Sequence, residues 1–247
     1  MMRKISICHG FVLTCLVTGL LFLSVNTASA DDMSTSQWGG FYAGGEVGMA
    51  TGDFDWQYQN PNYFNTLGAA ILGTGFDHSD SGAIGGIFAG YNHQIDPWVV
   101  GLEVSVAATD IEESKPSPLF ATDVYTSEMN WLTKVTGRVG YAWDRWLVYA
   151  KGGWAGADID LILDDPIALI NANSDEFATG WTAGIGAEYM LFNNVSLGIV
   201  YDYVDLSIDS ETINCPRCGV GVGLGTPVVD GDIELHSVMV RMGILFH

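Results

Sequence analysis

Basic residues inside apolar, strand-like segments are the feature of this sequence with the clearest chemical consequence. Lys134 and Arg138 lie in segment 129–141 and Lys151 lies in segment 146–157, and both segments are otherwise apolar and aromatic. Successive side chains of a β-strand point to opposite faces, so these three bases share one face of their strands. The same parity predicts eight inward charged residues, four acids and four bases: Glu46, Glu103, Lys134, Arg138, Lys151, Glu188, Asp202 and Arg241.

Charges in this pattern favour an enclosed network of ion pairs. A base that faces lipid near the middle of a bilayer costs about 2–4 kcal/mol, whereas buried ions are tolerated when they pair with good geometry. The interior of an eight-stranded barrel is just wide enough for side chains to fill. The sequence therefore predicts a neutral, plugged lumen, in which inward glycines make room for the long side chains: Gly44, Gly48, Gly101, Gly140, Gly184 and Gly186.

Eight strand-like segments must position these charges. They span residues 39–51, 83–93, 98–109, 129–141, 146–157, 179–191, 195–206 and 235–246. Short connections near 94–97, 142–145 and 192–194 alternate with long ones near 52–82, 110–128, 158–178 and 207–234. This alternation is typical of a membrane-spanning up-and-down barrel. The predicted fold class is all-β, an eight-stranded antiparallel up-and-down transmembrane β-barrel with short periplasmic turns and long extracellular loops.

The opposite face of the segments indicates contact with lipid. Trp98, Val100 and Leu102 alternate with Gly101 and Glu103, and a wall facing water would carry many more Lys, Glu and Thr residues. Aromatic residues on the apolar parity predict two girdles at the headgroup boundaries. They are Phe41, Tyr91, Trp98, Tyr141, Trp146, Tyr189 and Phe246 at the short-turn end, and Trp131, Trp154, Trp181 and Tyr203 at the long-loop end. The parity of segment 83–93 is ambiguous, because Ile84 and Phe88 share it with Asn92.

The first thirty residues have the pattern of an export signal. Arg3 and Lys4 precede an apolar run over residues 11–25, and a small-residue cleavage site over residues 28–30 precedes Asp31. The apolar run is short of the roughly 20 residues that a spanning helix needs. The predicted organisation is a cleaved signal peptide over 1–30, a short periplasmic segment over 31–38 and a barrel domain over 39–247.

The chain is strongly acidic. Its formal net charge is −20, and removal of Arg3 and Lys4 with the signal peptide makes the mature chain more acidic still. Nucleic acid is therefore excluded as a partner, because phosphate binding needs a basic patch. Balanced charges in the lumen place the excess in the predicted long loops: Asp53, Asp55, Asp77, Asp80, Glu112, Glu113, Asp158, Asp160, Asp164, Asp165, Asp175, Glu176, Asp209, Glu211, Asp230 and Asp232. Such loops either solvate the surface or attract divalent cations that bridge to anionic headgroups, which makes outer-membrane lipid and lipopolysaccharide the expected surroundings.

Other reactive residues give weaker hypotheses. Cys215 and Cys218, in the last long connection, predict a local disulfide rather than a metal pair, since no second Cys or His pair lies nearby. His78, near Tyr58 and Tyr63, is a candidate haem or metal ligand in a long loop, but a lone loop histidine is usually only polar. Short acidic runs lack the full spacing of a calcium loop, and no Ser, His and Asp set is grouped for catalysis. We therefore predict no bound cofactor, no metal site and no enzymatic activity.

Six stretches of the chain resemble a known family. They are WGGFYAGGEVG at 38–48, AGYNHQ at 89–94, GRVGYAWDRWLVYAKGG at 137–153, GWTAGIGAEY at 180–189, SLGIVYDYVDL at 196–206 and HSVMVRMGILFH at 236–247. They are similar to the small outer-membrane β-barrel proteins of Gram-negative bacteria, in particular the surface-antigen and haemin-binding-like porin branch of alphaproteobacteria. The resemblance implies an eight-stranded barrel in the outer membrane and assembly by the barrel-assembly machinery. For that family it implies roles in envelope integrity, host contact, porin activity or haemin binding. Family members usually end on the aromatic residue, whereas here His247 follows Phe246.

Three functional hypotheses follow. The leading one is a non-enzymatic outer-membrane barrel with a plugged lumen, serving envelope structure or surface interaction. The alternatives are a narrow cation-preferring porin, suggested by the acidic mouth, and a surface binder of haemin or divalent cations.

Overall fold

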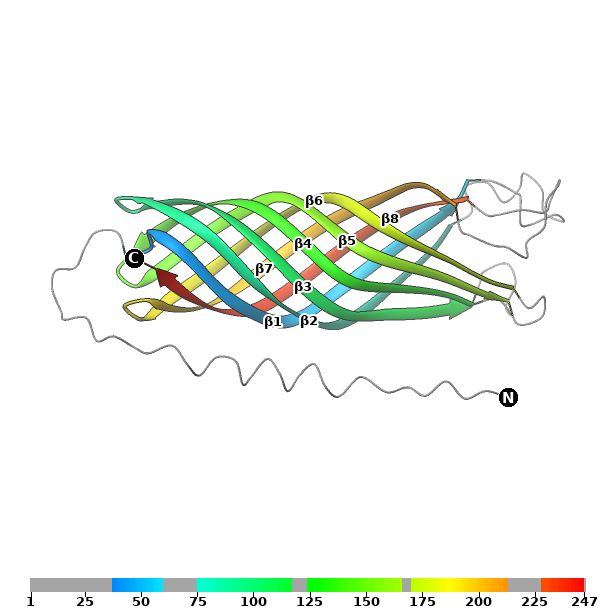
Figure 1. The fold of residues 1–247 in the computed structure, drawn as a ribbon, viewed down its shortest axis with the longest axis horizontal. Helices are drawn as coiled ribbons and strands as arrows, with labels where there is room; N and C mark the ends of the chain where they lie inside the picture. The colour runs from blue at the N-terminus through cyan, green and yellow to red at the C-terminus, as the bar shows by residue number, and fades with distance from the viewer. Residues whose placement is uncertain (1–36, 60–74, 117–123, 166–169, 213–227, 247) are drawn as a thin grey trace. The chain divides into compact units, whose positions relative to one another are not determined.

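The protein forms a closed antiparallel β-barrel. The computed structural model describes residues 37–59, 75–116, 124–165, 170–212 and 228–246 (Figure 1). The strands are β1 (Gly40–Tyr58), β2 (Gly75–Ile95), β3 (Trp98–Pro116), β4 (Val124–Trp143), β5 (Trp146–Asp165), β6 (Ile170–Phe192), β7 (Val195–Thr212) and β8 (Val228–Phe246). Each strand pairs with its sequence neighbours, and β1 pairs with β8 to close the barrel. In the described part of the chain, no helix is long and apolar enough to cross a membrane. The fold class is therefore the one that the sequence predicts.

Tight turns join the strands at one end of the barrel. Asp96 and Asp144 have φ angles of 53° and 48°, a conformation that Asp tolerates better than most residues and that two-residue hairpin turns require. The turns are also tied to the next hairpin, because the backbone N–H groups of Ala142 and Met190 donate to the carbonyls of Pro97 and Arg145. This end of the barrel is therefore continuously hydrogen-bonded.

Trp38 closes the same end from the inside. Its backbone N–H donates to Oε1 of Gln94 at 2.8 Å, and Nδ2 of Asn92 donates to its carbonyl at 3.0 Å. The indole is buried against apolar residues of several strands, among them Leu147 and Leu245. The predicted signal peptide lies outside the described residues, as does most of the predicted segment 31–38.

The strands extend far beyond the segments that the sequence indicates. The first predicted segment ends at residue 51 and the second begins at residue 83, whereas β1 runs to Tyr58 and β2 begins at Gly75. The sixteen acidic residues that we assigned to long loops all fall within strand bounds, so that assignment was wrong. The physical reason is that backbone pairing continues outside the bilayer, whereas the lipid-facing apolar pattern that we followed ends at its edge.

A reversal of polarity marks that edge. On β1 the outward side chains Val47 and Met49 are apolar, and further along the same face Asp53 and Asp55 are exposed to solvent. The inward face changes in the opposite sense, from Glu46 to apolar residues at positions 54 and 56. Lipid surrounds the part of the wall next to the short turns, and water surrounds the part toward the other end. The outward residues therefore change from apolar to acidic while the alternation of inward and outward side chains is kept.

The outward face of the membrane part carries the aromatic rings. Trp98 and Tyr141 lie 5.5 Å apart at the turn end, and Trp181 and Tyr203 lie 5.3 Å apart toward the other end. Segment 83–93, whose parity was ambiguous, directs Ile84, Phe88 and Asn92 inward, where all three are buried. The side chains of Ile84 and Phe88 and the amide of Asn92 therefore help to fill the lumen.

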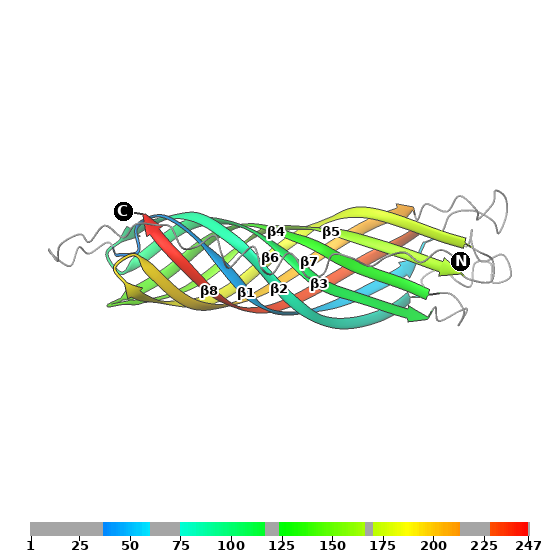
Figure 2. The same ribbon diagram turned by 60° about the horizontal axis from the view of Figure 1, so that its bottom comes forward.

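The wall divides into two sheets at its outer end. The β2–β3 ladder stops at the pair Ile84 and Thr109, although both strands continue, and the β6–β7 ladder stops at Thr179 and Ser207. Beyond these points β7, β8, β1 and β2 stay paired as one sheet, and β3, β4, β5 and β6 as another. The two groups of strand ends diverge on the right of Figure 1, and Figure 2 shows the same barrel turned about the horizontal axis. We call the unpaired boundary between residues 75–83 of β2 and residues 110–116 of β3 the β2–β3 seam.

Candidate functional site

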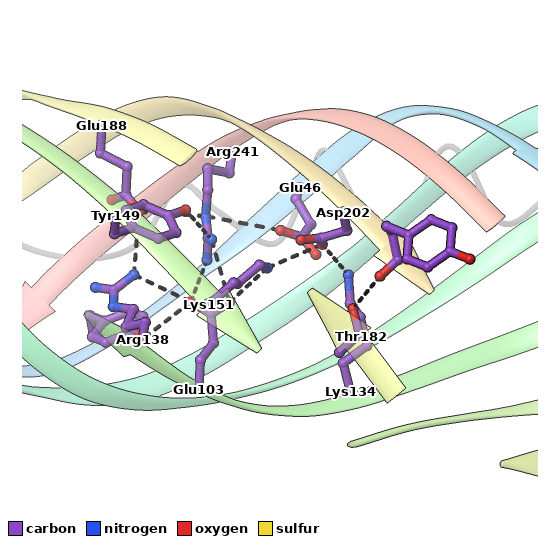
Figure 3. Close-up of polar contacts among 12 residues, drawn as sticks. Glu46, Glu103, Lys134, Arg138, Tyr149, Lys151, Thr182, Glu188, Asp202 and Arg241 are labelled. Carbon is purple, nitrogen blue, oxygen red and sulfur yellow. Dashed lines mark hydrogen bonds and ion pairs between the residues drawn. The ribbon is translucent and has the colours of Figure 1, made fainter. Parts of the chain in front are cut away.

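The inward charges lie together in the middle of the barrel (Figure 3). All eight predicted residues are buried: Glu46 from β1, Glu103 from β3, Lys134 and Arg138 from β4, Lys151 from β5, Glu188 from β6, Asp202 from β7 and Arg241 from β8. Seven of the eight strands thus contribute a charge. Most of the ion pairs among them, such as Lys134 with Asp202 and Arg241 with Glu103, link strands that are not neighbours in the sheet, so they brace the barrel across its interior.

Glu103 is the centre of the network. Its Oε2 accepts a hydrogen bond from Nη2 of Arg241 at 2.7 Å, and its Oε1 lies 3.4 Å from Nζ of Lys151. Nη1 of Arg138 lies 3.4 Å from Oε2, and the hydroxyl of Tyr42 donates to the same oxygen at 3.0 Å. One carboxylate therefore meets three bases and a phenol, which compensates for the loss of water around it.

Asp202 holds two lysines on the side nearer the outer end. Its Oδ2 lies 2.5 Å from Nζ of Lys134 and 3.1 Å from Nζ of Lys151. Since Lys151 also contacts Glu103, the two halves of the network are joined through one ammonium group. Neutralising a charged residue in one half of the network therefore changes the electrostatic environment of the other half.

Two further carboxylates complete the balance of charge. Glu188 lies 3.4 Å from Nη1 of Arg138, and its Oε2 accepts a hydrogen bond from the hydroxyl of Ser196 at 2.9 Å. Glu46 is held more loosely, because its nearest cationic atom among the described residues is Nε of Arg241 at 3.9 Å. Neither carboxylate oxygen of Glu46 accepts a hydrogen bond from the residues that the structure describes.

Aromatic rings cover the guanidinium groups. Arg241 stacks over Phe88 at 3.8 Å and Arg138 over Tyr42 at 4.2 Å, each distance measured from the guanidinium carbon to the ring centre. Nη1 of Arg241 also donates to the hydroxyl of Tyr149 at 2.7 Å. Sequence reasoning missed these aromatic partners. Tyr42 and Tyr149 share the inward parity of the charges and could have been found from it, because arginine pairs readily with ring faces.

Two apolar clusters enclose the charges. Toward the outer end the cluster contains Phe54, Trp56, Ile111, Met129 and Leu235 together with other inward residues of both sheets. Toward the turn end it contains Trp38, Phe88, Val99, Leu147, Met190 and Leu245 with Tyr42, Tyr149 and Ala142. The sequence analysis did not predict these clusters. They place packed apolar side chains on both sides of the charged layer.

Of the six inward glycines predicted to make room for the charges, Gly101 and Gly184 do so. A Cβ atom at the other four would meet backbone atoms or apolar and aromatic side chains instead: Gly44, Gly48, Gly140 and Gly186. A Cβ atom at Gly184 would collide with Oδ1 of Asp202, and one at Gly101 would collide with Oδ1 of Asn92, which accepts a hydrogen bond from Nε of Arg138. These two positions therefore require glycine because a carboxylate or an amide occupies the place of a side chain.

The other candidate residues do not join this site. Cys215 and Cys218 lie outside the described residues. His78 lies within β2, where its backbone pairs with Phe54, so its assignment to a loop was wrong, and its side chain is outside the described part. Among the residues that the structure describes, no group of three or more His, Cys, Asp or Glu side chains is placed to hold a metal ion.

A closed antiparallel barrel with an apolar, aromatic-banded wall is typical of the class of outer-membrane β-barrel proteins. Residues 17–225 match the family model described as outer membrane protein beta-barrel domain, and the chain belongs to this family. The protein is therefore a component of the bacterial outer membrane, with membrane lipid around its wall.

Relatives with similar sequences are outer-membrane proteins. The chain is 29% identical over 206 residues to the 31 kDa outer-membrane immunogenic protein of Brucella melitensis, covering 81% of this chain and 85% of that one. It is 29% identical over 198 residues to the 22 kDa outer membrane protein of Rhizobium leguminosarum, covering 75% and 77%. The crystal structure of OprG from Pseudomonas aeruginosa is similar with a TM-score of 0.57 at 17% identity, over 85% of this chain and 96% of that one, which shows the fold alone.

Proposed function

We propose that this protein is a non-enzymatic, plugged outer-membrane barrel that serves envelope structure and surface interaction. The observation that carries the proposal is the layered filling of the lumen. Eight buried charges occupy the middle, and an apolar cluster lies on each side of them. An ion entering from either end would have to displace packed apolar side chains before it met the charges.

The energetics of the charged layer support a permanent plug. Removing one member of a buried ion pair leaves an uncompensated charge in a low-dielectric interior and typically costs about 3–5 kcal/mol. Glu103 and Asp202 each hold more than one base, so a movement that opened the lumen would break several such contacts together. Conduction through a fluctuating plug is therefore strongly disfavoured.

The strand parts beyond the reversal of polarity, which we call the outer extension, support a role in surface interaction. Its two sheets share an apolar core, so this part of the wall is a packed structure rather than a set of loose loops. Exposed acids such as Asp53, Asp55, Asp158 and Asp232 line its outer face. This face repels anionic partners and attracts cationic ones. Contact with lipopolysaccharide through divalent cations, and assembly by the barrel-assembly machinery, belong to the same proposal.

Planar-bilayer recording of the purified, refolded protein tests the plug. We expect no steady single-channel steps from the wild-type barrel, under conditions in which a large general porin conducts. Steady steps that disappear or change in size on Glu103→Gln or Lys134→Met would show ions passing through the charged layer, and would replace the plug with the narrow cation-preferring channel. A heat-modifiability gel of each variant confirms that it is folded before its conductance is compared.

A further inference from the structure

The β2–β3 seam leaves part of a strand edge without a neighbouring strand. Among the strands that the structure describes, residues 75–83 of β2 are paired with β1 only, and residues 110–116 of β3 are paired with β4 only. Both strands nevertheless remain extended up to the seam's outer end, since β2 begins at Gly75 and β3 ends at Pro116. The seam therefore lies between two regular strands that do not pair with each other.

The direction of the free backbone groups on β2 follows from one hydrogen bond. The N–H of Ala83 donates to Oδ1 of Asp110 at 2.5 Å, so this N–H points toward β3 and a side chain occupies the place of the missing strand. Alternate residues of an antiparallel strand direct their N–H and C=O groups to the same side. Ser81, Ser79 and Asp77 therefore also direct their backbone groups into the seam.

A strand edge of this kind can accept an added strand. Unpaired N–H and C=O groups in a row form a template for main-chain pairing, which is the basis of peptide recognition by strand addition. The outward residues Ser79 and Ser81 are small and exposed, so they do not obstruct an incoming backbone. At the other seam, all side chains of β6 over residues 170–176 are outside the described part, whereas on β2 those of Ser79, Asp80 and Ser81 are described, so the β2 edge gives the better-defined site.

We propose that the β2 edge over residues 75–81 binds an extended, cationic segment of a partner protein by β-strand addition. The proposal rests on the proposed role in surface interaction and names the chemistry of the partner. Charge complementarity selects the partner, because Asp77 and Asp80 belong to one side of the seam and Asp110, Glu112 and Glu113 to the other. An acidic segment would be repelled from both sides, and a basic one attracted to both.

A synthetic peptide of about ten residues, alternating Lys and Val, is a suitable probe because its length matches a typical strand. The full-length mature protein in nanodiscs is titrated with this peptide by calorimetry. Two control peptides are measured in parallel. One replaces Lys by Glu, and the other carries N-methyl groups on alternate amides, which keeps the charge but prevents main-chain pairing. We expect binding of the Lys peptide, at least about tenfold weaker binding of the methylated peptide, and no binding of the Glu peptide.

Two variants at one position locate the site. Ser79→Pro removes an N–H that points into the seam, which an edge strand tolerates, and Ser79→Ala keeps it. We expect Ser79→Pro to weaken binding about tenfold, whereas Ser79→Ala binds like the wild type. Equal binding of the methylated peptide, or unchanged binding to a folded Ser79→Pro variant, would mean attraction by charge alone and would overturn the proposal, as would no binding to the wild type.

Hydrogen exchange on the wild type keeps the test decisive if Ser79→Pro fails to fold. Strand addition must slow exchange of the Ser79 and Ser81 amides when the Lys peptide is present, and unchanged exchange there would overturn the proposal. The outcome is independent of the plug, which is judged by conductance. A silent bilayer with no peptide binding rejects only the β2 site, and a conducting lumen rejects the plug whatever the peptide does.

Discussion

Nη2 of Arg241 lies 2.7 Å from Oε2 of Glu103, although the two residues are 138 positions apart and their strands, β8 and β3, do not pair. The contact crosses the interior of the barrel. It joins the last strand of the chain to the third, two strands that are not neighbours in the sheet. Because both side chains are fully enclosed, the contact makes the closed state more stable than any open sheet of the same strands.

Arg241→Met is expected to destabilise the barrel by about 3–5 kcal/mol, because Glu103 would lose its shortest ion pair and Glu46 its nearest cationic partner in a dry interior. Urea unfolding in detergent micelles, followed by tryptophan fluorescence, measures the change. Arg145→Met is the matched control. Arg145 is exposed, and its contact to the carbonyl of Leu191 is 3.5 Å long, so a change within about 0.5 kcal/mol is expected. Equal effects of the two substitutions would contradict the role given to the lumen pair.

Lys134 and Asp202 should be energetically coupled. Lys134→Met leaves Asp202 with Lys151 alone, and Asp202→Leu leaves both lysines without this carboxylate. The double variant is expected to be less destabilised than the sum of the two single variants, with a coupling free energy of about 0.5–3 kcal/mol. A double-mutant cycle on the free energy of unfolding measures it. Strict additivity would show that the 2.5 Å contact contributes nothing specific.

Leu235→Ala tests whether the outer extension is a packed structure. Leu235 is fully buried in the outer apolar cluster, and its loss is expected to cost about 2–5 kcal/mol. Its neighbour Glu234 faces outward and is exposed, so Glu234→Ala should change the free energy of unfolding by no more than about 0.5 kcal/mol. The rate of proteolytic cleavage at the outer strand ends, measured in intact membranes, compares the same two variants. If Leu235→Ala is as harmless as Glu234→Ala, the strands outside the bilayer do not share a core.

Leu102→Arg tests the lipid-facing parity. Leu102 is 69% exposed on the wall, roughly midway between Trp98 and Ala108, which is paired with Trp131. An arginine near the middle of the bilayer is expected to cost about 2–4 kcal/mol. Asp53→Arg lies on the outward face beyond the reversal of polarity and should cost less than about 1 kcal/mol. Folding equilibria in lipid vesicles give both free-energy changes. If Leu102→Arg changed the free energy of unfolding as little as Asp53→Arg, water rather than lipid would surround this part of the wall.

Periodicity determined the part of the fold that lies within the membrane. In residues 98–106 the alternation of apolar residues with Gly101 and Glu103 fixed the two faces of the strand, because lipid and lumen differ so sharply in polarity that each residue type is tolerated on one face only. The same rule predicted eight inward charges, since a charged residue inside an apolar strand has only the interior to face, and all eight side chains are buried. For the residues outside the bilayer the rule has less force, and Asp53, Asp55 and Asp232 were taken for loop residues although they lie in strands.

Only the tertiary structure decided which charge meets which. The contact of Arg241 with Glu103, the double contact of Asp202 and the cover that Phe88 and Tyr42 give to the arginines depend on how far each strand is shifted against the next around the barrel. That shift is a property of the closed sheet and leaves no mark in a single strand. The division of the outer wall into two sheets is of the same kind. The residues beside the seam look like ordinary strand residues, and whether their backbones pair depends on the distance between neighbouring strands, which closure and packing set together.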